Sequence, residues 1–384
     1  MKIDPYKHKE RYLAWKEKYT QGIAGISKEN SNLALQYLEN MESGINIALG
    51  SVKGSRSYSR LLSLKNRMIF FSKKFKESYN LDDITKIKEE QLIGFFSSLK
   101  RGTIKREDGC DFKSVDTYAK VFKAFWHWWM KSNKKKGIEI NDITLDLDTK
   151  QEKPDWVYLT EEQVKKLCDN AKFEYKILIM FLFDTGIRAP TELFNVKVSD
   201  LFNDFKELNI REETSKTFGR RIKLMLCTDL IKEYIKIKKL NPEDYLFNFT
   251  PCGVNQYLKR LATKVLGDGV SEAGQKYSEV SMYDFRHCSC CYWLPRYKSE
   301  SALKYRFGWK SSDKIHYYSE LLGMKDTIAE EDMLIDTTKT EIEQRLLQSE
   351  KKNEILQDRI ASMEKEIQKI TEVTNKLHME VITN

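Results

Sequence analysis

The chain has 384 residues, of which 41% are hydrophobic and 32% charged, a balance that argues against wholesale disorder and predicts domains with sizeable cores. No apolar run reaches the roughly 18 residues that a membrane span needs, and the charged first nine residues argue against a secretion signal. The formal charge is +9, and because residues 336–384 hold eight basic and ten acidic side chains, the positive excess lies in the first 335 residues. Such a basic body suits a polyanionic partner such as nucleic acid, although solubility alone would also explain it.

Glycine and proline, which interrupt helices, are sparse, with 17 and 6 residues, so helices should dominate. The seven cysteines are odd in number and contain no CxxC pair with a matching second half. They predict reduced thiols, as expected of a protein in the host cell cytoplasm.

Three amphipathic segments predict a helical domain at residues 58–131. They span about 59–79, 88–100 and 114–131, with apolar residues at helical spacing. The third segment carries an aromatic stripe that could stack on bases but is more typical of a core. Residues 1–57 are expected to form an N-terminal helical extension.

A polar stretch predicts a linker between domains at residues 132–156. Pro154 pushes the residue before it out of the helical region. The stretch also contains three consecutive lysines, which either contact a phosphate backbone or are simply solvated: Lys134, Lys135 and Lys136.

The second domain is expected at residues 157–335. It should start with a helix capped by Thr160 and Gln163, which form a capping box. Residues 172–183 are apolar on nearly all sides, so they predict a buried helix that ends at Gly186. Two β-like segments, 207–211 and 221–226, predict a hairpin, followed by further helices.

The last segment, residues 336–384, carries a heptad pattern. Mostly apolar residues occupy two positions of each heptad, alternately four and three residues apart, over nearly six heptads, and charged residues surround them. This pattern indicates a coiled coil. Asn353 at an a position, among mostly β-branched a residues, favours a parallel two-stranded form. The alternative is a long helix folded back onto its own domain.

Five motifs in the second domain carry the chemistry-bearing side chains. Each motif alone is weak evidence of function, because an arginine after a Thr-Gly turn or a lysine in a hairpin is common. In chain order they are Asp184-Thr-Gly-Ile-Arg188 followed by Glu192, Ser215-Lys216-Thr217, Tyr283-Asp-Phe-Arg286-His287, Phe307-Gly-Trp309 and Ile315-His-Tyr-Tyr318. In this order, and with Tyr318 nine positions beyond Trp309, they resemble the motifs of the tyrosine recombinase (phage integrase) family.

The resemblance covers about residues 60–335 and implies a mainly α fold. That fold has a SAM-like helical core-binding domain and an α+β catalytic domain with a small β-hairpin sheet, to which this chain would add its C-terminal coiled-coil helix. The implied function is site-specific cutting and rejoining of DNA through a 3′-phosphotyrosine, by an integrase of an archaeal virus or other mobile element. The implied partners are double-stranded DNA with a specific attachment site and further copies of the chain. These copies would form a dimer through the coiled coil and a tetramer at synapsis.

No cofactor, metal or ATP is expected, because the phosphotyrosine conserves the energy of the broken bond. A zinc site at His287-Cys288-Ser-Cys290-Cys291 is disfavoured, since these positions point in different directions on a helix and have no second ligand pair. Two alternatives remain open. One is a type IB topoisomerase-like activity that relaxes DNA, and the other is a catalytically inactive DNA-binding or segregation protein on the same fold.

By this resemblance, Arg188 and Arg286 would hold the non-bridging oxygens of the scissile phosphate. This role suits their guanidinium groups, which are planar and permanently charged. Tyr318 would be the nucleophile. Lys216 would give a proton to the departing 5′ oxygen, although Lys223 and Arg220 are close in sequence. Trp309 would donate its indole N–H to the phosphate or support Tyr318.

Three features depart from the family pattern. Tyr283 stands where the family usually has histidine, which keeps a hydrogen-bond donor but removes a group that titrates near neutrality. Glu192 follows Arg188 by four residues rather than three, so an irregularity near Pro190 must absorb one residue. The family also does not usually carry so long a heptad tail. The remaining candidates are His287 as a supporting residue and, for DNA contact, Arg220 and Arg221.

Overall fold

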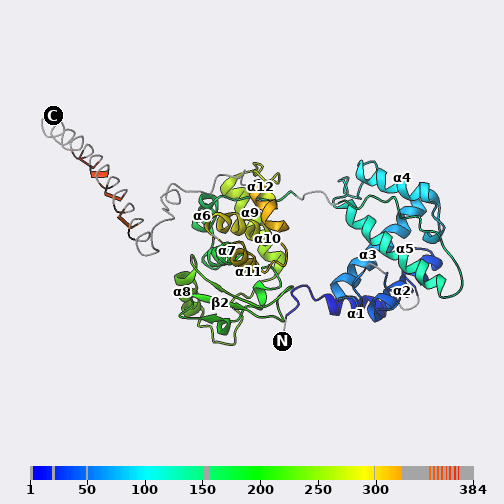
Figure 1. Ribbon diagram of the computed structural model, residues 1–384, viewed down its shortest axis with the longest axis horizontal. Helices are drawn as coiled ribbons and strands as arrows, with labels where there is room; N and C mark the ends of the chain where they lie inside the picture. Colours follow the sequence, from blue (N-terminus) through cyan, green and yellow to red (C-terminus); the bar gives the residue numbers. More distant parts are fainter. Residues whose placement is uncertain are drawn as a thin grey trace. The chain divides into compact units, whose positions relative to one another are not determined.

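The computed structural model describes residues 3–19, 22–48, 51–150, 155–297 and 299–321, together with isolated positions between 346 and 371. The chain divides into two compact units, Met1–Cys290 with Lys304–Lys310, and Cys291–Leu303 with Ser311–Asn384. The fold is mainly helical, with one small antiparallel sheet in the described residues (Figure 1). This confirms the predicted fold class.

Five helices occupy the described part of residues 3–150. The last three match the predicted segments, and the first two lie in the stretch predicted as a helical extension. Tyr12 and Tyr37 from that stretch share one hydrophobic core with Phe71 and Phe122, so these helices belong to the core of the domain. The helices are α1 (His8–Lys18), α2 (Lys28–Ser43), α3 (Tyr58–Tyr79), α4 (Glu89–Lys100) and α5 (Val115–Lys134).

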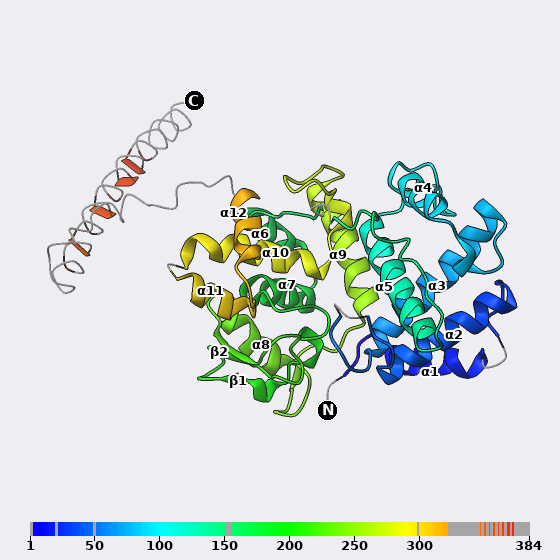
Figure 2. The ribbon, with the colours of Figure 1, turned by 45° about the vertical axis from the view of Figure 1, so that its right-hand side comes forward.

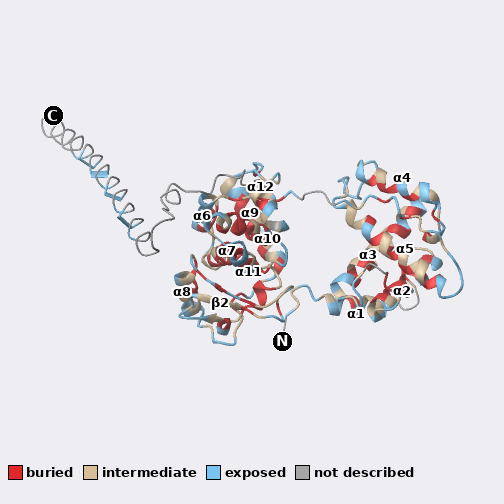
Figure 3. Ribbon diagram, viewed as in Figure 1, coloured by how far each residue is buried: buried red, intermediate tan, exposed pale blue. Residues whose placement is uncertain are grey.

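The aromatic stripe of α5 is buried, as the red segments of this helix in Figure 3 show. The side chains of Phe122 and Phe125 have no exposed surface, and Trp128 is 1% exposed. The Phe122 ring packs edge-on against Phe71 at 5.1 Å between centroids, a favoured geometry for aromatic pairs. The prediction that the stripe forms core is therefore confirmed.

The second domain begins with α6 (Glu161–Asn170) at the predicted capping box. The Gln163 N–H donates to the Thr160 hydroxyl at 3.3 Å, and the Thr160 N–H donates to the Gln163 side-chain oxygen at 3.0 Å. The later helices are α8 (Thr228–Lys238), α9 (Pro251–Leu266), α10 (Met282–Trp293), α11 (Glu300–Phe307) and α12 (Asp313–Leu321), with short 3-10 turns at Leu193–Asn195, Val198–Asp200, Tyr277–Glu279 and Leu294–Arg296.

The buried helix predicted at 172–183 is α7 (Phe173–Thr185), and it ends at Gly186 as expected. Gly186 has φ +57°, and a Cβ there would collide with the Phe307 ring and approach the Ser289 hydroxyl to 2.9 Å. Only glycine fits this close approach. α7 and the first part of α10 lie side by side in both ribbon views (Figures 1 and 2).

The predicted hairpin is confirmed as β2 (Glu207–Ile210) and β3 (Arg220–Lys223). A two-residue strand, β1 (Leu201–Phe202), extends it into an antiparallel sheet of order β1-β2-β3. Leu208 pairs with Ile222, and Ile210 pairs with Arg220. Side chains alternate along β3, so that Arg220 and Ile222 are buried while Arg221 and Lys223 are exposed.

The coiled-coil prediction falls on residues 336–384, nearly all of which lie outside the described residues, so it stays a prediction. The isolated positions described there are helical, and several apolar ones are at least half exposed, among them Leu346, Leu356, Ile360 and Ile367. In the part of the chain that the structure describes, no helix combines the length and apolar character required to cross a membrane.

Candidate active site

The turn after α7 places Arg188 against Glu192. The Arg188 N–H donates to Glu192 Oε2 at 3.1 Å, and Arg188 Nη1 donates to Oε1 at 2.7 Å. In return, the Glu192 N–H donates to the Arg188 carbonyl at 2.9 Å. This turn accommodates the extra residue between the two, so Glu192 still orients the arginine.

Arg220 is the second partner of Glu192. Its Nη2 donates to Glu192 Oε2 at 2.8 Å, and its Nε donates to the Arg306 carbonyl at 2.9 Å. The Arg220 side chain has no exposed surface. The prediction that Arg220 contacts DNA is therefore corrected, because the inward side of β3 places its guanidinium in the interior, where it binds Glu192.

Arg286 on α10 reaches the same region from another direction. Its Nη1 donates to the Gly186 carbonyl, and its Nη2 donates to the Phe307 carbonyl at 2.6 Å. Arg188 Nη2 donates to the next carbonyl along the chain, that of Gly308, at 2.7 Å. The two arginines of the predicted phosphate clamp are thus held on consecutive carbonyls at the C-terminal end of α11.

Arg188, Arg220 and Arg286 form an arginine cluster in which positive charge exceeds negative charge. Glu192 is the only carboxylate that pairs with Arg188 or Arg220, and Arg286 has no ion pair, in the described residues. Although burial raises the pKa of Glu192, the hydrogen bonds and charges of Arg220 and Arg188 outweigh it and lower that pKa to about 2. Burial, together with the positive charges of Arg188 and Arg220, lowers the pKa of Arg286 to about 10.

Arg286 therefore remains charged at neutral pH, and the cluster places three guanidiniums against one carboxylate. Each arginine has five N–H donors, and Arg286 uses two of them on carbonyls. The cluster combines excess positive charge with unused donors, which is the requirement of an anion-binding site.

A family profile described as the phage integrase family matches residues 157–323. These residues form a phage integrase family domain. Among solved structures, the chain is similar to the Tn1549 transposon integrase in complex with transposon right end DNA. The TM-score is 0.54 at 16% identity, over 75% of this chain and 94% of that one.

Two other structures show the same fold. One is the XerH site-specific recombinase bound to a palindromic difH substrate, with TM-score 0.53 and 15% identity over 83% of this chain and 96% of that one. The other is a lambda integrase dimer bound to a COC′ core site, with TM-score 0.55 and 13% identity over 83% of each chain. At such identities the likeness is one of fold. No curated protein matches the sequence.

Lys216 of the integrase domain lies in the loop between β2 and β3. It is exposed, and its ammonium has no hydrogen-bond or ion-pair partner among the described residues. The residues on either side of it, Ser215 and Thr217, do have partners within the arginine cluster, which are Glu192 and Gly308.

Gly308 lies in van der Waals contact with the arginine cluster. Its φ is +62°, and a Cβ there would lie 2.9 Å from Arg220 Nη1 and 3.2 Å from Arg188 Nη1. Trp309, the next residue, is half-buried and stacks on the Phe307 ring with centroids 4.9 Å apart. The glycine of this motif is thus required by the approach of two guanidiniums, a reason that the sequence pattern alone does not reveal.

Tyr283 and His287 lie on the same face of α10. Tyr283 is 49% exposed, and its ring packs edge-on against His287 at 5.1 Å. His287 also contacts the ring of Trp156 at 4.7 Å. The phenol that replaces the usual histidine is therefore accessible to a ligand, while His287 packs between aromatic rings.

Tyr318 belongs to α12 in the second compact unit. It is 4% exposed, and its ring lies 5.1 Å from that of Tyr317, which is partly buried. Its approach to the arginines of the integrase domain stays a prediction.

The other predicted DNA contacts lie at the surface. Lys134, Lys135 and Lys136 are exposed at the end of α5. Arg221 is exposed, pairs with Glu207 and stacks over the Phe202 ring at 4.5 Å. These four side chains stay candidates for contact with a DNA backbone.

The cysteines form no disulfide bond in the described residues. Cys110 and Cys252 are exposed, and the other five are buried, including Cys288, Cys290 and Cys291. Across the described ranges, no group of three histidine, cysteine or acidic side chains is arranged to hold a metal ion.

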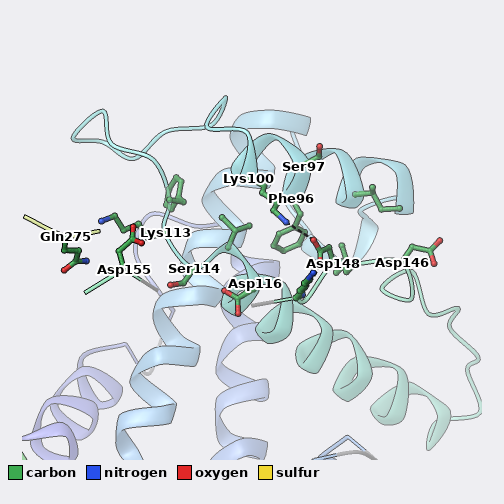
Figure 4. A pocket seen from close by; sticks show the side chains of 15 residues that line it. Phe96, Ser97, Lys100, Lys113, Ser114, Asp116, Asp146, Asp148, Asp155 and Gln275 are labelled. Carbon is green, nitrogen blue, oxygen red and sulfur yellow. Dashed lines mark hydrogen bonds and ion pairs between the residues drawn. The ribbon is translucent and has the colours of Figure 1, made fainter. Parts of the chain in front are cut away.

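A cavity of about 550 Å³ elsewhere in the first unit contains none of the predicted catalytic residues. Its lining includes Phe96, Asp116 and the ion pair of Lys100 with Asp148 at 2.9 Å (Figure 4). Acidic and basic side chains are mixed there, so the cavity lacks the excess of one charge that marks the arginine cluster.

The depressed pKa of Glu192 predicts a pH-dependent stability. Its pKa is about 2 in the fold, against 4.5 ordinarily. Its ionisation therefore stabilises the fold fully above pH 4.5, by about 3 kcal/mol, and this stabilisation is lost as the pH falls from 4.5 to 2. We expect Glu192→Gln to lower the free energy of unfolding of the full chain at pH 7 by about that amount, as measured by urea denaturation.

The difference between wild type and Glu192→Gln should shrink over the same acid range. Glu207→Gln, which breaks the exposed pair with Arg221, is the matched control and should change the free energy of unfolding by less than about 1 kcal/mol. A difference between wild type and Glu192→Gln that stays constant down to pH 2 would contradict the assignment.

Replacing Gly308 by alanine is expected to slow any DNA cleavage by about 100-fold, because the added methyl group must displace the guanidiniums of Arg188 and Arg220. Gly137→Ala is the control, since Gly137 also has positive φ, +78°, but no atom within 4 Å of the added Cβ. Equal cleavage rates for the two variants would show that backbone strain, and not the contact with arginine, sets the effect.

Proposed function

We propose that this chain is a site-specific tyrosine recombinase that cuts and rejoins double-stranded DNA through a 3′-phosphotyrosine intermediate, as the integrase of a mobile element. The observation that supports this most directly is the excess of positive charge at Arg188, Arg220 and Arg286 in a phage integrase family domain. DNA phosphate is the anion that such a domain would bind. The DNA-bound structures of the Tn1549 integrase and of XerH add support at the level of fold.

In the proposed complex, Arg188 and Arg286 bind the two non-bridging oxygens of the scissile phosphate. Their bonds to the carbonyls of Gly308 and Phe307 fix the two guanidiniums before DNA arrives. Preorganised donors stabilise the negative charge that develops during attack on phosphorus without reorganising at that moment. Trp309 and the exposed Tyr283 add neutral donors.

The covalent step forms one bond and breaks one. The phenolic oxygen of Tyr318 attacks phosphorus, the bond from phosphorus to the 5′ oxygen breaks, and the 3′ phosphate becomes attached to the tyrosine. The phenol proton passes to solvent, and the departing 5′ oxygen takes a proton from the Lys216 ammonium. Attack by a 5′ hydroxyl reverses these transfers and reseals the strand, so the proposal requires neither ATP nor a metal ion.

The coiled coil would join two protomers before four of them assemble at synapsis, since linking raises their effective concentration. The half-exposed apolar positions described in this segment, such as Leu346 and Ile367, support a second copy as the partner. A full chain that sediments as a monomer at micromolar concentration would contradict this part. We place the reaction in the host cell cytoplasm, where exposed thiols such as those of Cys110 and Cys252 stay reduced.

The decisive experiment captures the covalent intermediate. The full chain is incubated with a library of nicked duplexes made from the genome that encodes it, without metal ions or ATP, and DNA bound covalently to protein is isolated and sequenced. We expect one enriched sequence with a defined cleavage position. Adducts spread over all sequences, with relaxation of any supercoiled plasmid, would favour the topoisomerase alternative, and binding without an adduct would favour the inactive one.

A further inference from the structure

The loop that carries Lys216 is folded back on itself. It joins Ile210 of β2 to Arg220 of β3, and the N–H groups of Thr214 and Ser215 both donate to the Arg211 carbonyl at 3.1 Å. Thr214 is buried. The N–H of Thr217 donates to the Ser215 hydroxyl at 3.3 Å. These bonds give the loop a defined shape but do not by themselves fix its position in the integrase domain.

Two side-chain hydroxyls connect this loop to the arginine cluster. Ser215 Oγ donates to Glu192 Oε1 at 3.0 Å, and Thr217 Oγ1 donates to the Gly308 carbonyl at 2.9 Å. They flank Lys216 on its two sides. The flanking bonds fix the backbone of the lysine. Its side chain is exposed, and its ammonium has no hydrogen-bond partner among the described residues.

The acceptors of these two bonds are the ones that hold Arg188. Arg188 Nη1 donates to the same Glu192 Oε1 at 2.7 Å, and Nη2 donates to the same Gly308 carbonyl at 2.7 Å. Each bridge between the loop and the guanidinium thus passes through a single oxygen atom. An arrangement with two such bridges fixes both the distance and the orientation of the loop relative to Arg188.

We propose that Ser215 and Thr217 are positioning residues for the general acid, which set the Lys216 ammonium at the leaving oxygen of the phosphate that Arg188 binds. This inference rests on the proposed function, in which Lys216 protonates the 5′ oxygen. A displacement of about 1 Å is enough to reduce a rate 100-fold when reacting groups must be aligned. In this proposal the two hydroxyls transfer no proton themselves and act through the position of the lysine.

The test uses the duplex identified by covalent capture, in two forms. One has the natural 5′ oxygen at the scissile position, and the other has sulfur there, which leaves as a thiolate with a much lower pKa than an alcohol and needs no proton donor. We expect the Ser215→Ala/Thr217→Val double variant to form the covalent adduct about 10- to 100-fold more slowly on the oxygen substrate. On the sulfur substrate its rate should equal that of wild type.

Three further variants complete the comparison. Lys216→Ala should show the same selective recovery on sulfur, and Thr217→Ser, which keeps a hydroxyl, should behave as wild type. Ser199→Ala removes an exposed hydroxyl that has no hydrogen bond in the described residues and should have no effect. A defect of the double variant that persists on sulfur would overturn the inference, because the loss would then not concern proton donation.

A second measurement does not depend on activity. Amide hydrogen exchange of the peptide spanning residues 211–219 in the full chain should accelerate about tenfold in the double variant and remain unchanged in Ser199→Ala. Unchanged exchange in the double variant would overturn the inference whatever the kinetics. A wild-type protein that forms no adduct on either substrate would contradict the proposed function instead, so the two failures are distinguishable.

Discussion

Replacing Tyr318 by phenylalanine is expected to abolish the covalent protein–DNA adduct completely. The substitution removes only the phenolic oxygen, which is the atom that would become bonded to phosphorus, and leaves the ring in its buried position. The arginines and Lys216 remain, so DNA binding should persist. The measurement is adduct formation on the captured duplex in denaturing gels, with a mobility-shift assay for binding.

The neighbouring tyrosine supplies the matched control. Tyr317 lies beside Tyr318 on α12, with ring centroids 5.1 Å apart, but it is only partly buried. Tyr317→Phe removes the same atom one position away and should form the adduct at the wild-type rate. If Tyr317→Phe lost the adduct and Tyr318→Phe kept it, the nine-residue spacing from Trp309 would have selected the wrong nucleophile.

Replacing Arg220 by methionine is expected to lower the free energy of unfolding by about 3 to 5 kcal/mol, the usual effect of removing one partner of a buried ion pair. Arg220 has no exposed surface and gives Glu192 two of its hydrogen bonds, at 2.8 and 3.3 Å. Without it, the carboxylate keeps Arg188 as its only ion-pair partner among the described residues, and the Arg306 carbonyl loses a donor. Urea denaturation of the full chain measures the change.

Arg221 provides the control for this prediction, because it is the next residue of β3 and also pairs with a glutamate, Glu207, but is exposed. Arg221→Met should cost at most about 1 kcal/mol. Combining Arg220→Met with Glu192→Gln should reveal a coupling of about 1 to 3 kcal/mol between the two sites. Equal effects at positions 220 and 221, or strict additivity, would argue against a buried pair that organises the site.

The elements with a clear period or cap could be predicted from sequence. α3, α5 and α7 follow from apolar residues at helical spacing or on all faces, and α6 from its capping box. α1 gives no such signal, because its only buried residue is Tyr12 and the rest of the helix is polar or partly exposed. The two-residue strand β1 is too short to show an alternation at all.

The candidate site was predictable where it depends on motif order and unpredictable where it depends on packing. Arg188 and Arg286 follow from their motifs, but the inward position of Arg220 was missed because arginine is typical of a surface. A signal was available in the strand itself. Since Ile222 must face the core, the residue two positions before it faces the core as well. The shared acceptors of Arg188 and the Lys216 loop come from distant segments, which no local pattern brings together.

The unequal burial of the cysteines makes the native chain suitable for site-directed spectroscopy. Burial raises the pKa values of the Cys168 and Cys291 thiols to about 12, so these groups hardly form the thiolate with which maleimides react. Cys110 and Cys252 are exposed, and they lie in the helical domain and in α9 of the integrase domain. A donor and acceptor dye on this pair would report, without any engineered residue, how the distance between the two domains changes when DNA is added.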